Sequence, residues 1–173
     1  MNIKLVQPSQ EHEEWYHSMI KEFLDNGEGI MPKQMQFREK EIYETFLSRI
    51  QDQKDWINLK PWYVPWTLYF IVNEDGNVIW WSAIRHYLSK ELLIHWWHIS
   101  HGIKPSERWK WYATKALKLA LLEAKKLWID KVMLTCDKNN LASARTIVKN
   151  WWILDYEYLH EWIMIQKRWI ENK

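Results

Sequence analysis

Residues 98–117 read HISHGIKPSERWKWYATKAL, and this stretch predicts a strand, a basic turn and a helix in direct succession. Residues alternate along HISHGI as they do in a half-buried strand. Pro105 ends the strand, because proline offers no N–H group to a β-ladder. The turn carries Arg108, and a strong helical pattern starts at about Tyr112. Such a turn presents free backbone N–H groups and the positive end of a helix dipole. Together these bind an anion, most naturally a phosphate.

The composition is typical of one domain of 173 residues, with 24 Lys and Arg against 22 Asp and Glu. The formal net charge of +2 argues against a dedicated nucleic-acid binder. A single cysteine, Cys136, excludes an internal disulfide and favours a reducing compartment. No apolar run approaches the ~18 residues of a membrane span, and the first residues turn charged too soon for a signal peptide. We therefore expect one cytoplasmic domain over residues 1–173, with no membrane or nucleic-acid partner.

The hydrophobic patterns predict the remaining elements of the fold. In chain order they are a strand at 2–6, helices at 9–24 and 37–50, a long loop at 52–66, a hairpin at 68–72 and 78–87, a strand at 92–103, a helix at 115–127, a strand at 131–136, a helix at 140–150, and a closing hairpin at 153–159 and 163–170. The order β-α-α-β-β-β-α-β-α-β-β indicates an α/β (α+β) domain with a mixed, mainly antiparallel sheet flanked by helices.

Tryptophan is abundant in this chain and glycine is scarce. There are 15 Trp and 4 Gly, whereas a chain of this length would carry roughly a dozen glycines. Trp128 and Trp151 follow predicted helix ends, where a left-handed residue is needed and glycine usually supplies it. Trp109 and Trp111 stand where a phosphate would have to approach bare backbone. We hypothesise that many of these tryptophans are displaced glycines, encoded by a UGA codon that the source lineage reads as glycine.

The chain resembles the GNAT family of N-acetyltransferases over nearly its full length. The family's signature for acetyl-CoA, Arg/Gln-x-x-Gly-x-Gly/Ala, aligns with residues 108–113, RWKWYA, where Arg108 and Ala113 match and Trp111 replaces the first glycine. A second family feature aligns with Asn140-Leu-Ala-Ser-Ala and with 149–152, KNWW. The segment IRHYL with GIKPSER is similar to one branch of predicted acetyltransferases.

The resemblance implies direct transfer of an acetyl group from acetyl-CoA to a primary amine on a small molecule or a peptide. It implies that backbone groups of the turn hold the pyrophosphate, that Ile103 pairs with the pantetheine arm, and that Asn140, which also caps a helix, contacts the cofactor. The implied cofactor-binding residues are Ile103, Arg108, Trp109, Lys110, Trp111, Tyr112, Ala113, Thr114 and Asn140. The tyrosine that many members use as general acid is Ile147 here. We expect a monomer or a homodimer.

Three histidines are candidates for the general base. His98 and His101 lie on the strand that faces the acetyl group and the amine in the family, and His86 lies on the neighbouring strand. A neutral imidazole there could take the proton of the amine, directly or through water.

Three alternatives compete with this interpretation. His95, His98 and His101 suggest zinc, but on one strand their spacing puts His98 on the face opposite the other two, so we expect no metal site. Aromatic residues interleaved with Arg108 and Lys110 could stack on single-stranded nucleic acid, which the near-neutral charge disfavours. A GNAT-fold domain whose turn is blocked by tryptophan could also act through partners, without catalysis.

Overall fold

The computed structural model describes residues 2–29, 41–108, 110 and 112–172. Its elements follow one another as β1 (Lys4–Val6), η1 (Gln10–His12), α1 (Glu13–Asp25), α2 (Tyr43–Lys54), β2 (Trp66–Val72), β3 (Val78–Arg85), α3 (Leu92–His95), β4 (Ile99–Ile103), η3 (Pro105–Glu107), α4 (Tyr112–Lys126), β5 (Lys131–Asp137), α5 (Leu141–Lys149), β6 (Ile153–His160) and β7 (Ile163–Glu171). The predicted order is confirmed, with α3 as an addition.

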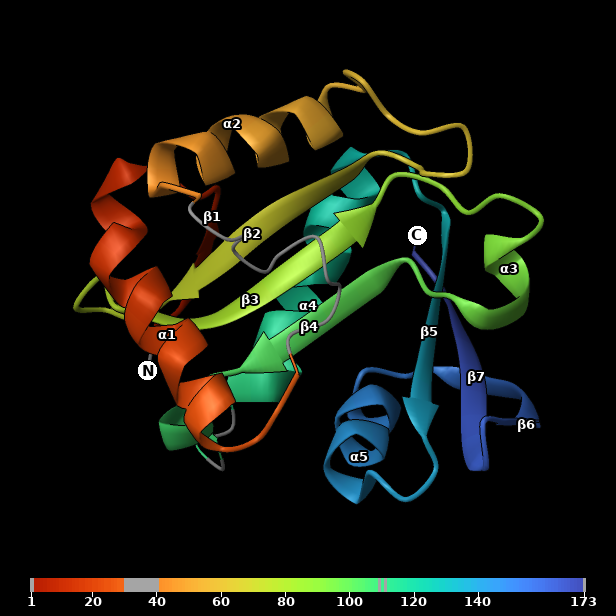
Figure 1. The fold of residues 1–173 in the computed structure, drawn as a ribbon. Helices are drawn as coiled ribbons and strands as arrows, with labels where there is room; N and C mark the ends of the chain where they lie inside the picture. The colour runs from red at the N-terminus through yellow and green to blue at the C-terminus, as the bar shows by residue number, and fades with distance from the viewer. Residues whose placement is uncertain (1, 30–40, 109, 111, 173) are drawn as a thin grey trace.

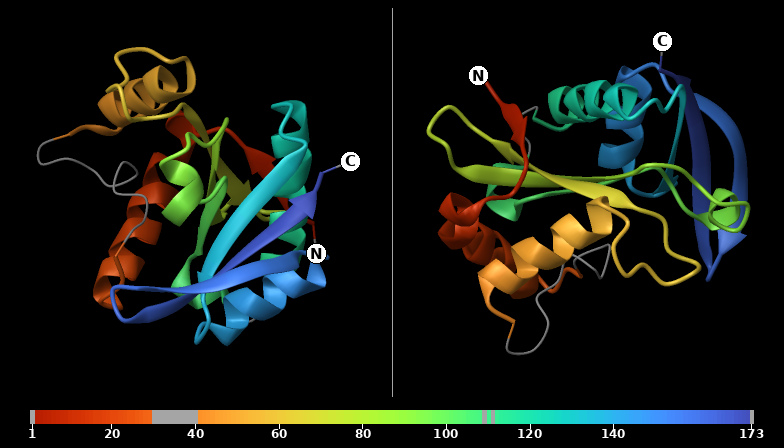
Figure 2. Two further views of the ribbon diagram at one scale, coloured as in Figure 1. Left: turned by 90° about the vertical axis from the view of Figure 1, so that its right-hand side faces the viewer. Right: turned by 90° about the horizontal axis from the view of Figure 1, so that it is seen from above.

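The strands form two antiparallel sheets, one in the order β1-β2-β3-β4 and the other in the order β5-β7-β6. Helices α1 and α2 cover one face of the first sheet, and α4 covers the other (Figures 1 and 2). The two sheets meet where β4 and β5 begin, and the two strands then diverge toward their carboxyl ends (Figure 1). The fold class is confirmed, and the predicted single sheet is split at this junction.

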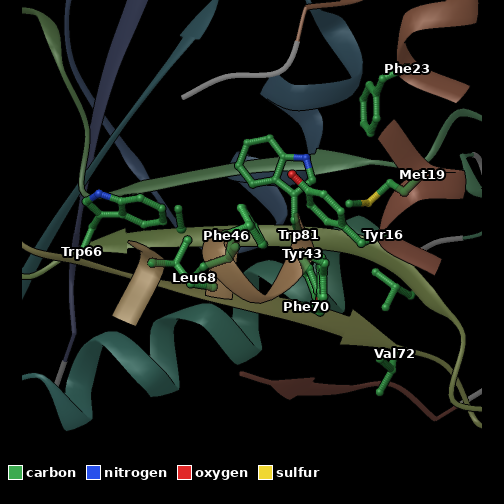
Figure 3. Close-up of a cluster of buried hydrophobic side chains, with 13 residues drawn as sticks. Tyr16, Met19, Phe23, Tyr43, Phe46, Trp66, Leu68, Phe70, Val72 and Trp81 are labelled. Carbon is green, nitrogen blue, oxygen red and sulfur yellow. The ribbon is translucent and has the colours of Figure 1, made fainter. Parts of the chain in front are cut away.

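Strand β2 is the centre of the core, because all seven of its residues are buried. Leu68 and Phe70 alternate with Tyr69 and Ile71, so each face of the sheet has its own apolar cluster. On the side of α1 and α2 the cluster is aromatic: the ring of Tyr16 lies 4.7 Å from that of Phe46 and 5.7 Å from that of Phe70 (Figure 3). Alanines and leucines of α4 fill the opposite side.

The segment 92–103, predicted as one strand, contains a short helix and a shorter strand. The side-chain oxygen of Ser89 accepts the N–H of Leu92, the first residue of α3, 3.3 Å away. The prediction failed because an apolar run does not by itself distinguish a strand from a buried helical turn. Helix α2 is also displaced, since it continues to Lys54 and shortens the predicted loop; residues 37–40 lie outside the described residues.

Among the described residues, four tryptophans have a left-handed backbone. The φ angles are +65° at Trp56, +61° at Trp128, +66° at Trp151 and +69° at Trp162, a region that bulky residues seldom occupy. The N–H of Trp128 donates to Lys125 O and that of Ile129 to Ala124 O, which is the pattern of a glycine-terminated helix. Positions 128 and 151 therefore have the conformation that the sequence predicts for glycine.

Buried tryptophans are unusual in a second respect. The indole N–H groups of Trp80, Trp81, Trp97 and Trp152 are buried and have no hydrogen-bond partner among the described residues. A buried indole N–H normally finds an acceptor. These four positions are thus poorly suited to tryptophan for a reason independent of backbone conformation, which supports the displaced-glycine hypothesis.

We predict that Trp128→Gly combined with Trp151→Gly raises the free energy of unfolding by about 1–2 kcal/mol per site, since a left-handed backbone is costly for any residue with a Cβ. Both indoles are almost fully exposed, at 90% and 86%, so their removal loses little packing. Denaturant unfolding of the double variant measures the change. As a control, Trp15→Gly within α1 should destabilise the protein, because that position is helical.

An equal or lower stability of the double variant would contradict this account of the two helix ends. The coding DNA tests the hypothesis independently, since UGG codons at 109, 111, 128 and 151 would exclude it.

Candidate active site

The predicted anion-binding turn follows β4 as the sequence indicates. Strand β4 ends at Ile103, Pro105 opens the 3-10 helix η3, and α4 runs from Tyr112 for 15 residues. The first backbone N–H groups of a helix have no acceptor within the helix and lie at the positive end of its dipole. Those of Tyr112, Ala113 and Thr114 therefore suit an anion. Trp109 and Trp111 lie outside the described residues.

A cleft of about 640 Å³ lies beside this turn, with walls from β4, the start of α4 and α5. Most of the predicted cofactor-binding residues line it, and so does one candidate base: Ile103, Arg108, Lys110, Tyr112, Ala113, Thr114, Asn140 and His101. The fold thus brings together residues that are up to 39 positions apart, from His101 to Asn140.

Helix α5 contributes two cations to the cleft that the sequence analysis missed. Arg145 and Lys149 both line its wall. Their spacing of four residues within a predicted helix places them on one face, and this was the available signal. Asn140 starts the same helix: its side-chain oxygen accepts the N–H of Ser143, 3.0 Å away, which confirms the predicted cap.

Carboxylates of α1 and of the segment after it already contact the basic turn. Arg108 donates to both oxygens of Glu28, with N···O distances of 2.7 and 2.6 Å. These hydrogen bonds hold the pKa of the Glu28 carboxyl below its usual value. Glu22 accepts the backbone N–H and the hydroxyl of Ser106, at 2.5 and 3.1 Å. Its burial tends to raise the pKa of Glu22, but the hydrogen bonds from Ser106 and Lys104 outweigh burial and lower it. The turn therefore attracts anions within its own chain.

His101 is the candidate base that lies at the cleft. It pairs with Ser82 of β3, and its ring centroid is 5.2 Å from that of Trp80. Its Nδ1 atom is buried without a hydrogen-bond partner among the described residues. Burial lowers the pKa of His101 to about 4, so the imidazole is neutral near pH 7 and can accept a proton.

His98 lies where β4 and β5 meet and does not line this cleft. Its backbone N–H donates to Met133 O, and its Nδ1 accepts the Met133 N–H, both at 2.9 Å. The ring therefore replaces a backbone carbonyl in the hydrogen bonding between the two strands. Burial, with a smaller contribution from the charge of Arg85, lowers the pKa of His98 to about 4.

The other candidate residues of the sequence lie elsewhere. His86 follows β3 outside the cleft, and its Nε2 is 2.8 Å from Thr67 Oγ1. Burial is the main reason why the pKa of His86 is lowered. Cys136 is buried, and burial raises the pKa of its thiol, as expected for a core residue without an activating base.

The described residues contain neither a candidate metal cluster nor a membrane-spanning helix. No group of three or more His, Cys, Asp or Glu side chains within the described ranges could hold a metal ion. His95, the third histidine of the zinc alternative, belongs to α3 and not to the strand. No helix in the part of the chain that the structure describes is both long enough and apolar enough to cross a membrane.

Solved structures of N-acetyltransferases have a fold similar to that of this chain. The spermidine N-acetyltransferase of Vibrio cholerae, solved with CoA and spermine, superposes with a TM-score of 0.66 at 12% identity, covering 98% of this chain and 95% of that one. An N-acetyltransferase of Staphylococcus aureus Mu50 gives 0.63 at 13%, covering 100% of both chains. For yncA of Salmonella typhimurium, solved with its cofactor acetyl-CoA, the values are 0.61 and 11%, with 99% and 94% covered.

The chain therefore has the fold of the N-acetyltransferases, and the resemblance to the GNAT family is confirmed at the level of the fold. No family model matches the sequence, and no curated protein matches it.

The two buried histidines predict a pH dependence of stability. Both have a pKa of about 4 in the folded protein against 6.5 ordinarily. As the pH falls from about 6.5 to about 4, the unfolded chain binds protons at these positions and the folded chain does not, so the free energy of unfolding decreases. Above pH 6.5 their contribution is constant.

Denaturant unfolding between pH 4 and 8 measures this slope. His101→Gln should make the slope shallower. A slope that is the same in the His101 variant and the parent would contradict the lowered pKa of that group.

Proposed function

We propose that the protein transfers an acetyl group from acetyl-CoA to a primary amine. The observation that carries this proposal is the cleft beside the turn between β4 and α4, which lies at the N-terminus of α4 in a fold shared with N-acetyltransferases over nearly their full length. The neighbours solved with CoA or acetyl-CoA support the same cosubstrate.

The residues of the cleft fit a CoA molecule chemically. The N–H groups that start α4 face the cleft together with Lys110, Arg145 and Lys149, and this combination suits the phosphates of CoA. Strand β4 is the last strand of its sheet, and after His98 no strand of the described residues pairs with its free edge. Ile103 on that edge can therefore pair with the amide groups of the pantetheine arm. Acetyl-CoA supplies an activated thioester carbonyl.

The chain's own residues would then accept the proton that the amine releases and stabilise the charge on the carbonyl oxygen. We assign the general-base role to His101, because it is the one of the three candidate histidines that lines the cleft. His98, whose Nδ1 is already an acceptor, and His86 lie outside the cleft and remain weaker candidates. Backbone N–H groups of β4 would stabilise the developing charge on the carbonyl oxygen.

The proposal also covers the cellular location and the oligomeric state of the protein. A cytoplasmic enzyme agrees with the single cysteine. A monomer or homodimer stays the prediction for assembly. Strand β6 exposes Ile153 at 70% and Leu159 at 61%, and an apolar edge of this kind favours pairing with a second copy. A non-catalytic domain of the same fold is the alternative function, and it is favoured if the tryptophans of the turn block the cofactor.

Isothermal titration with acetyl-CoA separates the two functions. We predict weak or undetectable binding by the parent sequence, because the sequence has Trp109 and Trp111 at positions where the resemblance implies that the pyrophosphate meets bare backbone. Trp109→Gly with Trp111→Gly should restore a dissociation constant in the micromolar range, about −8 kcal/mol. The pair Trp128→Gly and Trp151→Gly serves as the matched control and should not change affinity. Absence of binding by the turn variant would favour the non-catalytic alternative.

The assignment of the base has its own test in whichever variant binds acetyl-CoA. His101→Ala should lower the rate of acetyl transfer by roughly 10², the usual effect of losing a general base, and leave the affinity for acetyl-CoA nearly unchanged. Steady-state rates at pH 7 measure the effect, with His86→Ala as the control. An unchanged rate in the His101 variant would remove this residue from the mechanism.

A further inference from the structure

One face of helix α5 forms a wall of the cleft. Ala142, Arg145, Thr146 and Lys149 all line the cleft, and spacings of three and four residues place them on a single face of the helix. Arg145 and Lys149 are exposed, so a ligand in the cleft can reach both. The helix has 9 residues, and none of them is acidic. This wall of the cleft therefore carries positive charge.

The end of α5 is fixed against the start of α4. The side-chain amide of Asn150 donates to Thr146 O at 3.0 Å and to Thr114 O at 3.3 Å. Asn150 is buried and follows the last residue of α5, and Thr114 belongs to the first turn of α4. Lys149, the residue before Asn150, is thus next to this junction. Arg145 lies one helical turn, about 5.4 Å, farther along α5.

The cations of the turn are compensated, whereas Arg145 is not. Two carboxylates, those of Glu28 and Glu107, line the cleft among the described residues. Glu28 accepts two hydrogen bonds from Arg108, and Glu107 accepts one from Lys110 at 3.1 Å. Arg145 has no ion pair and no side-chain hydrogen bond within the part of the chain that the structure describes. Its guanidinium is therefore available to an anion from outside the chain.

Lys149 has an ordinary structural role as well. It lies in the last turn of α5, where a cation stabilises the negative end of the helix dipole. Arg145 lies in the middle of the helix, and the dipole does not account for a cation there. We therefore regard Arg145 as the principal candidate for binding an anion, with Lys149 beside it.

We propose that Arg145, assisted by Lys149, binds the 3′-phosphate on the ribose of CoA, so that the protein distinguishes CoA from forms that lack this phosphate. This inference rests on the proposed acetyltransferase function and narrows its cosubstrate. CoA carries a pyrophosphate and, separately, a phosphate monoester on its ribose. The N–H groups that start α4 suit the pyrophosphate, which leaves the monoester for the cations of α5. A guanidinium fork is complementary to the oxygens of such a phosphate.

The test compares two ligands that differ only in this phosphate. Isothermal titration of the full chain, and of its Trp109→Gly and Trp111→Gly double variant, uses CoA and 3′-dephospho-CoA. In whichever chain binds, CoA should bind about ten-fold or more tightly, because hydrogen bonds between charged groups contribute on this scale. Arg145→Gln in the same chain should remove most of this preference by weakening the binding of CoA, and should leave the affinity for 3′-dephospho-CoA unchanged.

Two further variants separate recognition of the phosphate from general effects of charge. Arg145→Lys keeps the positive charge and should retain part of the preference. Lys118→Gln removes a cation from an exposed position of α4 that does not line the cleft, and should leave the preference unchanged. Thermal melts identify any variant that loses its fold. Equal affinities for the two ligands before Arg145 is changed, or a full preference in a folded Arg145→Gln variant, would overturn the assignment.

Acetyl transfer, measured in the same chains with a panel of primary amines, distinguishes the two possible failures. Transfer from acetyl-CoA together with equal affinities for CoA and 3′-dephospho-CoA would contradict this inference alone. The expected preference without transfer to any of the amines would contradict the proposed function and leave a CoA-binding domain. Chains that bind neither ligand would contradict both.

Discussion

The contact between His98 and Met133 is the constraint on which the rest of this structure depends. The Met133 N–H donates to Nδ1 of His98, where a neighbouring strand would normally offer a backbone carbonyl. A backbone hydrogen bond from the His98 N–H to Met133 O lies beside it. These bonds join two sheets that would otherwise share no ladder. The joint holds β4 and β5 together near the start of β4, and the two strands diverge toward their carboxyl ends (Figure 1). A charged imidazole could not accept this bond, so the joint needs His98 neutral, as its burial ensures.

Charge is distributed unevenly about this joint. At the open end, the basic turn already has carboxylate partners in Glu22 and Glu28, so an incoming phosphate competes with groups of the same chain. At the closed end, Arg85 and Lys167 have only carbonyl, hydroxyl and aromatic neighbours. The first arrangement is neutral without a ligand, whereas the second leaves positive charge uncompensated in a buried place.

Several of the described tryptophans fit their surroundings, and several others do not. Trp66 and Trp169 have acceptors for their indole N–H groups, in Gln53 and Asp155, and fit their environments. Others have either a left-handed backbone with an exposed ring, as at Trp128, or a buried N–H without a partner, as at Trp81. At Trp81 the ring also lies against Gly102, where a Cβ would come within 2.6 Å of the indole nitrogen. A glycine would remove each of these difficulties, and no other residue type would remove all of them.

The sequence by itself determined the order of the elements, the hairpin turn at 73–77, the cap at Asn140, the phosphate-type turn after β4 and the left-handed positions at 128 and 151. All of these depend on residues within a few positions of one another, where periodicity, proline and capping rules apply. Only the tertiary structure decided that His101 lies at the cleft while His98 joins two sheets, because alternation along a strand gives a face but not the partner across a gap. Arg145, Lys149, Arg85 and Lys167 likewise acquire their positions from contacts between distant segments, and no local pattern encodes such contacts.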